Sequence, residues 1–121
     1  MLNRKEKGKL GEDLAVAFLK QQGFRVVAQN FRCPLGEIDL IARDGKTLVF
    51  VEVKSRFAMR YGAPEELVSR AKQRRLTRLA RWYLKQHRME GQPARFDVVA
   101  IRWQDAEPEI KWIANAFEAC D

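Results

Sequence analysis

The sequence is poor in the residues that bind transition metals or act as catalytic bases. His87 is the only histidine, and Cys33 and Cys120 are the only cysteines among 121 residues. This shortage nearly excludes a zinc site, and it excludes a serine or cysteine hydrolase unless His87 is the base. The cysteines lie far apart in the sequence, which fits two reduced thiols better than a disulfide. Any metal bound here is expected to be a hard cation held by carboxylates.

Long apolar runs are absent as well. No segment approaches the length of a membrane span, and the N-terminal residues MLNRKEKGKLGED contain no apolar signal-peptide region. We therefore expect a cytoplasmic protein that does not insert into a membrane. The length of 121 residues and the apolar content of 46% predict one domain, residues 1–121, with a hydrophobic core.

Apolar periodicity and turn residues predict an α/β fold with the element order α-β-β-β-α-β-β. Asn3 is a candidate N-cap and Gly23 a stop for the first helix, and Ser69 is a candidate N-cap for the second. The predicted helices cover residues 4–22 and 70–87, and the predicted strands cover residues 24–29, 36–43, 46–55, 94–104 and 109–114. We expect a central mixed five-stranded sheet flanked by the helices, with a loop over residues 57–68 and a turn over 105–108. The apolar stripe of the first helix is expected to contain Leu10, Leu14, Ala17 and Phe18.

Charged residues interrupt two strands that are otherwise apolar, GEIDLIAR and LVFVEVKS. A two-residue turn at Asp44-Gly45 would pair Arg43 with Lys46 and place Asp39 opposite Phe50, diagonal to Glu52. Strand alternation then puts one set of charged side chains on the same face of the two strands. This set is Glu37, Asp39, Glu52 and Lys54. An exposed strand with its charges toward water is the simpler alternative, but the apolar residues on both faces favour a functional site.

Carboxylates that face one another in an apolar sheet repel, and a bound Mg²⁺ or Mn²⁺ relieves that repulsion. Asp39 and Glu52 are close enough in this arrangement for both to reach one ion. Lys54 beside the ion could orient an attacking water or stabilise charge that develops on a phosphate. Glu37 is expected either to bind the ion or to hold Lys54. The pattern is typical of metal-assisted phosphodiester hydrolysis.

The stretch GEIDLIARDGKTLVFVEVKSR resembles the PD-(D/E)xK motif of the restriction-endonuclease-like superfamily. Asp39 matches the first acid and Glu52 to Lys54 the ExK triplet, whereas Ile38 stands where the motif often has proline. The segments KGKLGEDLAVAFL, KQRRL and FDVVAI extend the resemblance over nearly the whole chain, to the YraN-type uncharacterised bacterial family. That family is similar to archaeal Holliday-junction resolvases.

The resemblance implies a restriction-endonuclease-like fold and an Mg²⁺- or Mn²⁺-dependent endonuclease acting on DNA, with branched or otherwise structured DNA as the expected substrate. It also implies that Glu12, on the first helix, completes the metal site, with the carbonyl of Val53 as an extra ligand. Taken alone, Glu12 is equally consistent with a solvated glutamate near the start of a helix.

The second predicted helix is strongly basic. Lys and Arg outnumber Asp and Glu by 23 to 16 in the whole chain, for a net charge of +7, and residues 70–88 contain eight basic residues and no acid. Such a one-sided stripe disfavours an isolated helix and favours contact with a polyanion, whereas a solvated surface helix usually mixes both signs. An acidic membrane surface is the competing ligand. The predicted nucleic-acid-binding residues are Arg70, Lys72, Arg74, Arg75, Arg78, Arg81 and Lys85.

Lys72 differs from the other basic residues because helical spacing places it with Leu76, Leu79 and Tyr83, facing the sheet. There it could point at the metal site and meet a substrate phosphate. Two functions remain open on the sequence alone: a metal-dependent nuclease, which the retained Asp, Glu and Lys favour, and a nucleic-acid-binding adaptor with weak or no catalysis. A homodimer that presents two sites is consistent with the small size of the chain.

Overall fold

The computed structural model describes residues 3–57, 68–103 and 107–120. Its elements are α1 (Arg4–Gln21), β1 (Arg25–Cys33), β2 (Gly36–Asp44), β3 (Thr47–Phe57), α3 (Arg70–Gln86), β4 (Ala94–Trp103) and β5 (Glu109–Phe117). The predicted order and the α/β class are confirmed, although β1 and β5 are longer than predicted. Most of the predicted loop over residues 57–68 and part of the turn before β5 lie outside the described residues.

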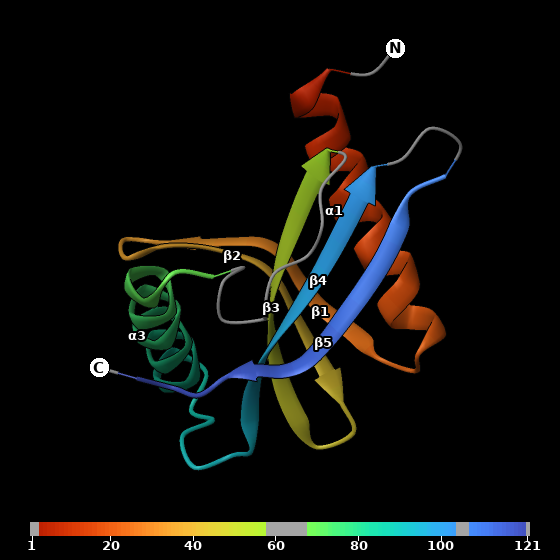
Figure 1. Cartoon of the computed structure of the whole chain (residues 1–121). Coiled ribbons are helices and arrows are strands. Elements are labelled where there is room, and N and C mark those ends of the chain that lie inside the picture. The colour runs from red at the N-terminus through yellow and green to blue at the C-terminus, as the bar shows by residue number, and fades with distance from the viewer. Residues whose placement is uncertain (1–2, 58–67, 104–106, 121) are drawn as a thin grey trace.

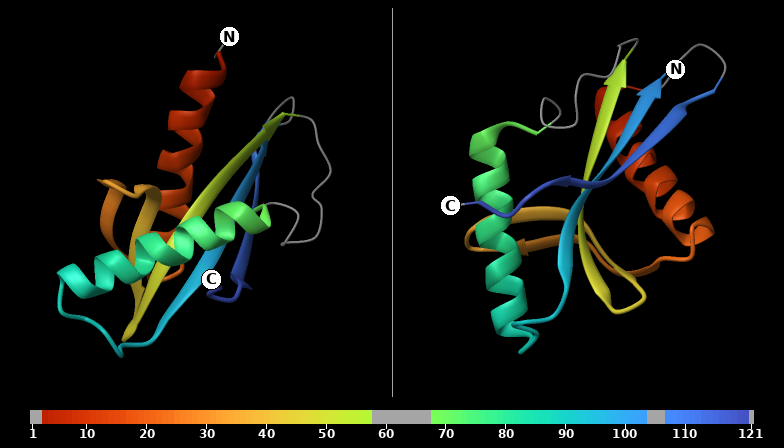
Figure 2. Two further views of the ribbon diagram at one scale, coloured as in Figure 1. Left: turned by 90° about the vertical axis from the view of Figure 1, so that its left-hand side faces the viewer. Right: turned by 60° about the horizontal axis from the view of Figure 1, so that its bottom comes forward.

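The five strands form one mixed sheet, as predicted, and their order in the sheet is β1-β2-β3-β4-β5 (Figure 1). β3 and β4 are parallel, and every other neighbouring pair is antiparallel. A parallel pair needs a crossover connection, and the segment that contains α3 supplies it. The two helices cover opposite faces of the sheet, so that α3 lies in front of the strands and α1 behind them in the left view of Figure 2.

Each helix packs on its own hydrophobic cluster. Leu76, Leu79 and Tyr83 of α3 belong to a cluster with Phe50 and other residues of the sheet. On the opposite face, α1 contributes a second cluster whose members include Ala15, Val16 and Leu19. The alternating strand residues therefore serve two cores, one on each face.

The sheet-facing side of α1 differs in part from the predicted stripe, of which Leu14 and Phe18 pack against the second cluster as expected. Leu10 is 37% exposed and Ala17 is exposed, whereas Ala15 and Leu19 are fully buried. Gly11 explains the difference, because a Cβ at this position would lie 2.9 Å from the side-chain oxygen of Ser55. The helix approaches the sheet most closely at a residue without a side chain, which a count of apolar side chains overlooks. The close approach at Gly11 keeps Glu12, the next residue, near the sheet.

The β2–β3 hairpin turns one residue later than predicted. Asp44 pairs with Thr47 and Leu40 with Val51, so Gly45 and Lys46 form the two-residue turn. Gly45 has a φ of +61° and occupies the first central position, where a hairpin turn of this length favours glycine. Every cross-strand partner therefore moves by two residues, which leaves each side chain on its predicted face. Continuing this register places Asp39 opposite Glu52.

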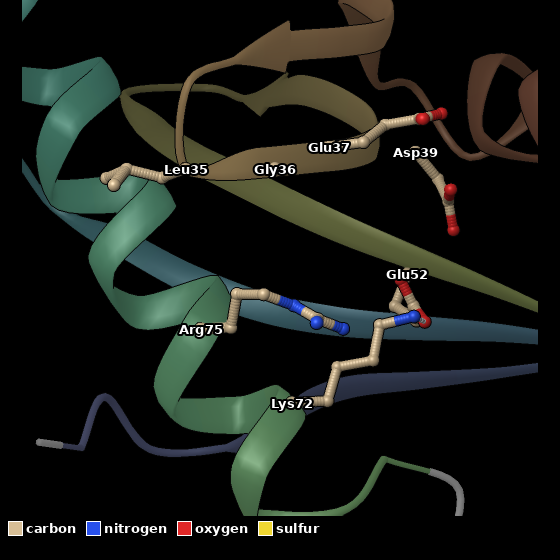
Figure 3. Close-up of a pocket in the computed structure, with 7 residues that line it drawn as sticks. All are labelled: Leu35, Gly36, Glu37, Asp39, Glu52, Lys72 and Arg75. Atoms are coloured by element: carbon tan, nitrogen blue, oxygen red, sulfur yellow. Dashed lines mark ion pairs between the residues drawn. The ribbon is translucent and has the colours of Figure 1, made fainter.

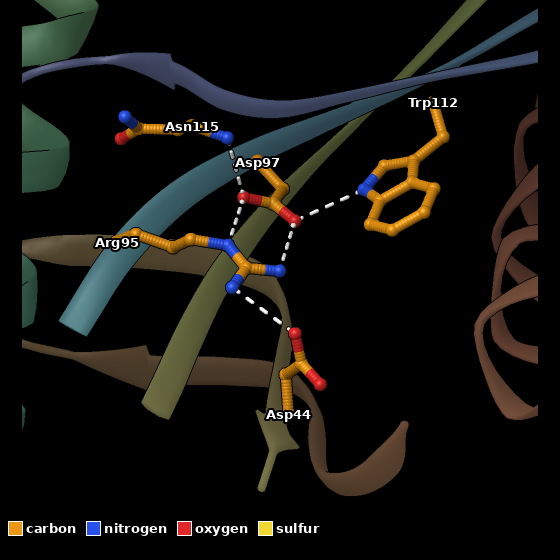
Figure 4. Close-up of polar contacts among 5 residues, drawn as sticks. All are labelled: Asp44, Arg95, Asp97, Trp112 and Asn115. Carbon is orange, nitrogen blue, oxygen red and sulfur yellow. Dashed lines mark hydrogen bonds and ion pairs between the residues drawn. The ribbon is translucent and has the colours of Figure 1, made fainter. Parts of the chain in front are cut away.

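A buried carboxylate fixes the far end of the sheet (Figure 4). Asp97 of β4 is 1% exposed and accepts hydrogen bonds from Arg95 Nε and Nη2, Trp112 Nε1 and the Asn115 backbone N–H, at 2.9 to 3.2 Å. Arg95 also pairs with Asp44, at 3.1 Å, beside the hairpin turn. Because donors surround the carboxylate, its burial is compensated, and it ties β5 and the hairpin to β4.

The remaining sequence expectations concern the cysteines and the membrane. Cys33 and Cys120 are free, partly buried thiols. Within the described part of the chain, neither helix is long and apolar enough to cross a membrane.

Candidate functional site

β2 and β3 separate where the predicted acids lie. The ladder between them runs from Asp44–Thr47 to Leu40–Val51. Beyond that point β2 bends aside toward α3, whereas β3 continues beside β4 (Figure 1). Asp39 lies at this fork, and its Oδ2 accepts a hydrogen bond of 2.9 Å from the backbone N–H of Val53. The carboxylate therefore takes the place of a strand partner, which holds it firmly against β3.

Glu52 is almost fully enclosed and carries two ion pairs. Its side chain is 4% exposed, and Lys54 Nζ lies 3.3 Å from its Oε2. Lys72, which reaches across from α3, contacts the same oxygen. Sequence spacing had placed Lys72 on the inward side of the helix, and the structure confirms this position. Pairing with cations compensates the cost of burying the Glu52 charge.

The charge of Glu52 acts on Asp39. Burial, followed by the negative charge of Glu52, raises the pKa of Asp39 to about 7, although the hydrogen bond from Val53 acts in the opposite direction. The charged form of such a carboxyl group is stabilised by any nearby cation that is not already paired with another acid. Two carboxyl groups held this close are a suitable ligand pair for a hard divalent cation.

The acids line a pocket of about 370 Å³ between the β1–β2 hairpin and α3. In Figure 3, Lys72 and Arg75 extend from α3 on one side, and Asp39 and Glu37 lie on the other. Glu52 lies between the two sides. The lining residues are Leu35, Gly36, Glu37, Asp39, Glu52, Lys72 and Arg75. The pocket thus brings acids from two strands together with bases from the helix.

Glu12 lies within electrostatic reach of the same acids. Partial burial raises its pKa, a hydrogen bond with Asn30 opposes that shift, and the charges of Glu37, Asp13 and Glu52 add to it. Glu12 therefore lies close enough to Glu37 and Glu52 to feel their charges, and its role in the metal site stays a prediction. Asn30 was not predicted as part of the site. It has a φ of +51°, a conformation that asparagine tolerates better than most residues. The signal in the sequence that could have indicated it is an asparagine directly after a predicted strand.

Glu37 does not hold Lys54, which was one of the two roles predicted for it, and its role as a metal ligand stays a prediction. Its Oε2 lies 3.2 Å from Arg32 Nε on the neighbouring strand, and its side chain is 39% exposed. Lys54, which Glu37 was expected to hold, pairs with Glu52 instead. Glu37 still lines the pocket, where it adds negative charge near Glu12 and Asp39.

α3 presents the predicted basic surface. Leu76, Leu79 and Tyr83 are buried against the sheet, which turns the opposite side of the helix outward. The exposed or partly exposed basic side chains of α3 are Arg70, Lys72, Arg74, Arg75, Arg78, Arg81 and Lys85. The helix ends at Gln86, so Arg88 lies beyond it. The first turns of this helix adjoin the pocket through Lys72 and Arg75.

The profile of the uncharacterised protein family UPF0102 matches residues 11–101. The chain belongs to this family. A UPF0102 protein of Syntrophus aciditrophicus (strain SB) is 49% identical over 111 residues, which cover 92% of this chain and 87% of that protein. A UPF0102 protein of Symbiobacterium thermophilum is 51% identical over 113 residues, which cover 93% of this chain and 96% of that protein.

Among solved structures, the structure of Pyrococcus furiosus SfsA in complex with Ca²⁺ matches with a TM-score of 0.43 and 14% identity. The match covers 94% of this chain and 64% of that chain. A likeness of this degree carries no inference about the UPF0102 site.

The oxygen donors of this UPF0102 chain fit a hard cation. In residues 3–57, 68–103 and 107–120, no group of three or more His, Cys, Asp or Glu side chains is arranged to hold a metal. Asp39 and Glu52 nevertheless supply two carboxylates, and the carbonyl of Val53 points to the same side of β3 as the N–H bonded to Asp39. Mg²⁺ commonly uses only one or two carboxylates and completes its shell with water and substrate phosphate.

Proposed function

We propose that this chain is a divalent-cation-dependent nuclease that hydrolyses phosphodiester bonds in DNA. The observation that supports it best is the junction of Asp39, Glu52 and Lys54, where two carboxyl groups and an ammonium group meet at the end of a strand ladder. Lys72 adds a second ammonium from the basic helix. A fork with these groups, beside a cationic surface, suits a substrate that carries phosphate.

Asp39 and Glu52 would hold Mg²⁺ or Mn²⁺, together with the carbonyl of Val53, and Glu12 would approach from α1. The bound cation would supply Lewis acidity and lower the pKa of a water molecule. Lys54, held beside Glu52, would orient the attacking water or stabilise charge on the phosphate. Asp39 is already fixed by the N–H of Val53, so little reorganisation is needed before the cation binds.

The basic side chains of α3 would bind the phosphate backbone. Contacts with phosphates release condensed counterions, which makes this binding strong at low salt and largely independent of base sequence. The pocket lies between α3 and the β1–β2 hairpin, so a backbone that follows α3 passes the acids. Branched or structured DNA in the cytoplasm is the proposed substrate, and two copies of the chain would present two such sites.

One observation favours a second candidate, a nucleic-acid-binding adaptor with little or no catalysis. Lys54 and Lys72 both pair with Oε2 of Glu52, so this carboxylate has cationic partners without a metal. An acid neutralised in this way can serve as a structural link between α3 and the sheet. The basic helix would then bind nucleic acid without cleavage.

Cleavage assays separate the two candidates. The chain is incubated with labelled branched, single-stranded and linear duplex DNA in the presence of Mg²⁺ or Mn²⁺, beside Asp39→Ala and Lys54→Ala. We expect each substitution to reduce cleavage at least about a hundredfold, because each removes a group placed at the reacting phosphate. Asp13→Ala, which removes an exposed acid of α1, is the matched control and should cleave as the parent does.

Two results would contradict the nuclease. Unchanged cleavage by both Asp39→Ala and Lys54→Ala would show that the activity resides elsewhere or in a contaminant. Binding of DNA with no cleavage of any substrate, with either cation, would select the adaptor.

A further inference from the structure

Lys72 is the movable member of the cluster around Glu52. Lys54 is two residues from Glu52 on the same strand, so its ammonium group stays near the carboxylate. Lys72 reaches Glu52 from a different element, and its side chain is 30% exposed whereas that of Glu52 is 4% exposed. Lys72 already lines the pocket, where its side chain extends from α3 to Glu52 (Figure 3).

A divalent cation on Oε2 of Glu52 repels the ammonium groups that pair with this oxygen, and the repulsion between charges a few ångströms apart is strong where little water screens them. Lys54 is held near by its place on the same strand, so the ammonium group of Lys72 is the one that we expect to leave. Its departure exposes an uncompensated ammonium group at the wall of the pocket.

The charges of the pocket indicate the next partner of Lys72. Three acids and two bases line the pocket, and Lys54 adds a third base beside Glu52. When all six groups are ionised their charges balance, so a bound divalent cation leaves a surplus of two positive charges. Arg75, on the same side of α3, lines the pocket with Lys72. An anion bound between them would offset the surplus, and a phosphate of a nucleic-acid backbone is the anion that the basic helix suits.

We propose that Lys72 is an exchangeable counter-ion, which pairs with Glu52 in the absence of a divalent cation and transfers to a backbone phosphate when a cation binds. This inference rests on the proposed function of the same site. The exchange couples the binding of the divalent cation to that of the phosphate, because each ligand stabilises the position of Lys72 that the other requires. Nucleic acid then raises the affinity for the cation, and the cation raises the affinity for nucleic acid by the same factor.

The coupling is measured by Mn²⁺ titration of the full chain, with free Mn²⁺ followed by electron paramagnetic resonance. The titration is run with and without a short DNA duplex, whose integrity is checked on a gel afterwards. In the parent chain we expect the duplex to tighten Mn²⁺ binding about tenfold, within the usual range of coupling between sites. In Lys72→Met, Mn²⁺ should bind about tenfold more tightly without DNA, and the duplex should add almost nothing.

Two further variants separate exchange from a general effect of charge. Arg75→Met removes a positive charge from the same pocket but not a partner of Glu52, so it should weaken duplex binding and leave the Mn²⁺ affinity without DNA unchanged. Lys72→Arg keeps a cation at the position and should restore the coupling that Lys72→Met loses. Circular dichroism of each variant checks that the fold is retained.

The outcomes distinguish this inference from the proposed function. If the parent chain cleaves DNA and binds Mn²⁺ but Lys72→Met changes neither Mn²⁺ affinity nor coupling, the exchange is wrong and the nuclease stands. An equal gain in Mn²⁺ affinity without DNA in Arg75→Met also overturns the exchange, because the loss of any positive charge from the pocket would then suffice. A parent chain that binds no Mn²⁺ overturns both.

Discussion

Replacement of Asp39 by asparagine should stabilise the metal-free chain by an amount that grows with pH. Asparagine keeps an oxygen that can accept the hydrogen bond of 2.9 Å from the Val53 N–H, but it carries no titrating group. Asp39 itself is partly buried beside Glu52, which raises its pKa from 3.8 to about 7. The substitution therefore removes an electrostatic cost and preserves the local geometry.

The sign and size follow from proton linkage. Because the pKa of Asp39 is higher in the folded chain, unfolding releases a proton between pH 3.8 and about 7, and stability falls as pH rises through this window. Each pH unit inside the window lowers the free energy of unfolding by about 1.4 kcal/mol. The ionisation of Asp39 therefore lowers it by about 2 to 3 kcal/mol between pH 5 and pH 8. The stability difference between Asp39→Asn and the parent chain should widen by that amount.

Urea unfolding in EDTA, followed by tryptophan fluorescence at pH 5, 6, 7 and 8, measures this difference. Asp13→Asn, which removes an exposed acid of α1, sets the pH trend expected from the loss of a surface carboxylate. A difference between Asp39→Asn and the parent that stays constant from pH 5 to pH 8 would refute the reasoning. Added Mn²⁺ should stabilise the parent more than Asp39→Asn, because the cation needs the carboxylate.

Three further substitutions test other parts of the structure. Gly11→Ala should lower the unfolding free energy by about 1 to 2 kcal/mol relative to Gly8→Ala, measured in urea, because a Cβ at Gly11 meets a serine oxygen of β3 at 2.9 Å and one at Gly8 meets open space. Asp97→Ala should cost about 3 kcal/mol or more in the same assay, because Arg95 and other donors lose their buried acceptor. Arg78→Gln should reduce the salt dependence of DNA binding by about one phosphate contact, whereas Lys20→Gln, at the end of α1, should not.

Local signals predicted most of the fold. Asn3 forms the capping box that starts α1, and Ser69 caps α3 through its bond to the Lys72 N–H. The position of the hairpin turn and the buried side of α1 were predicted less well, and both involve a glycine. The Asp44-Gly45 pair allows two placements of a hairpin turn, and the pairing of Asp44 with Thr47 shows which of them the chain adopts. Gly11 marks the closest approach of α1 to the sheet, which depends on a surface that the helix sequence does not contain.

The site was predictable where it depends on periodicity. Strand alternation assigned Asp39, Glu52 and Lys54 to one face, and it did so despite the wrong register because the error was an even number of residues. Helical spacing assigned Lys72 to the inward side of α3. The pairing of both lysines with one oxygen of Glu52 was not predictable, because it depends on how far apart β3 and α3 lie.

The separation of β2 from β3 is the feature that no local pattern reveals, and hydrophobic packing accounts for it. β3 remains paired with β4 along its whole length, from Leu48 to Phe57, so it cannot follow β2. β1 and β2 instead bend toward α3, where Phe31 of β1 packs edge-on against Tyr83 with ring centroids 5.2 Å apart.

The fork at Asp39 is therefore opened by apolar contacts some distance from the acids. It leaves the Val53 N–H without a strand partner, and Asp39 is the side chain that satisfies it. The same bend forms the wall of the pocket that faces Lys72. The core thus determines the position of each charged group, and this explains how acids can lie within an apolar sheet without disrupting it.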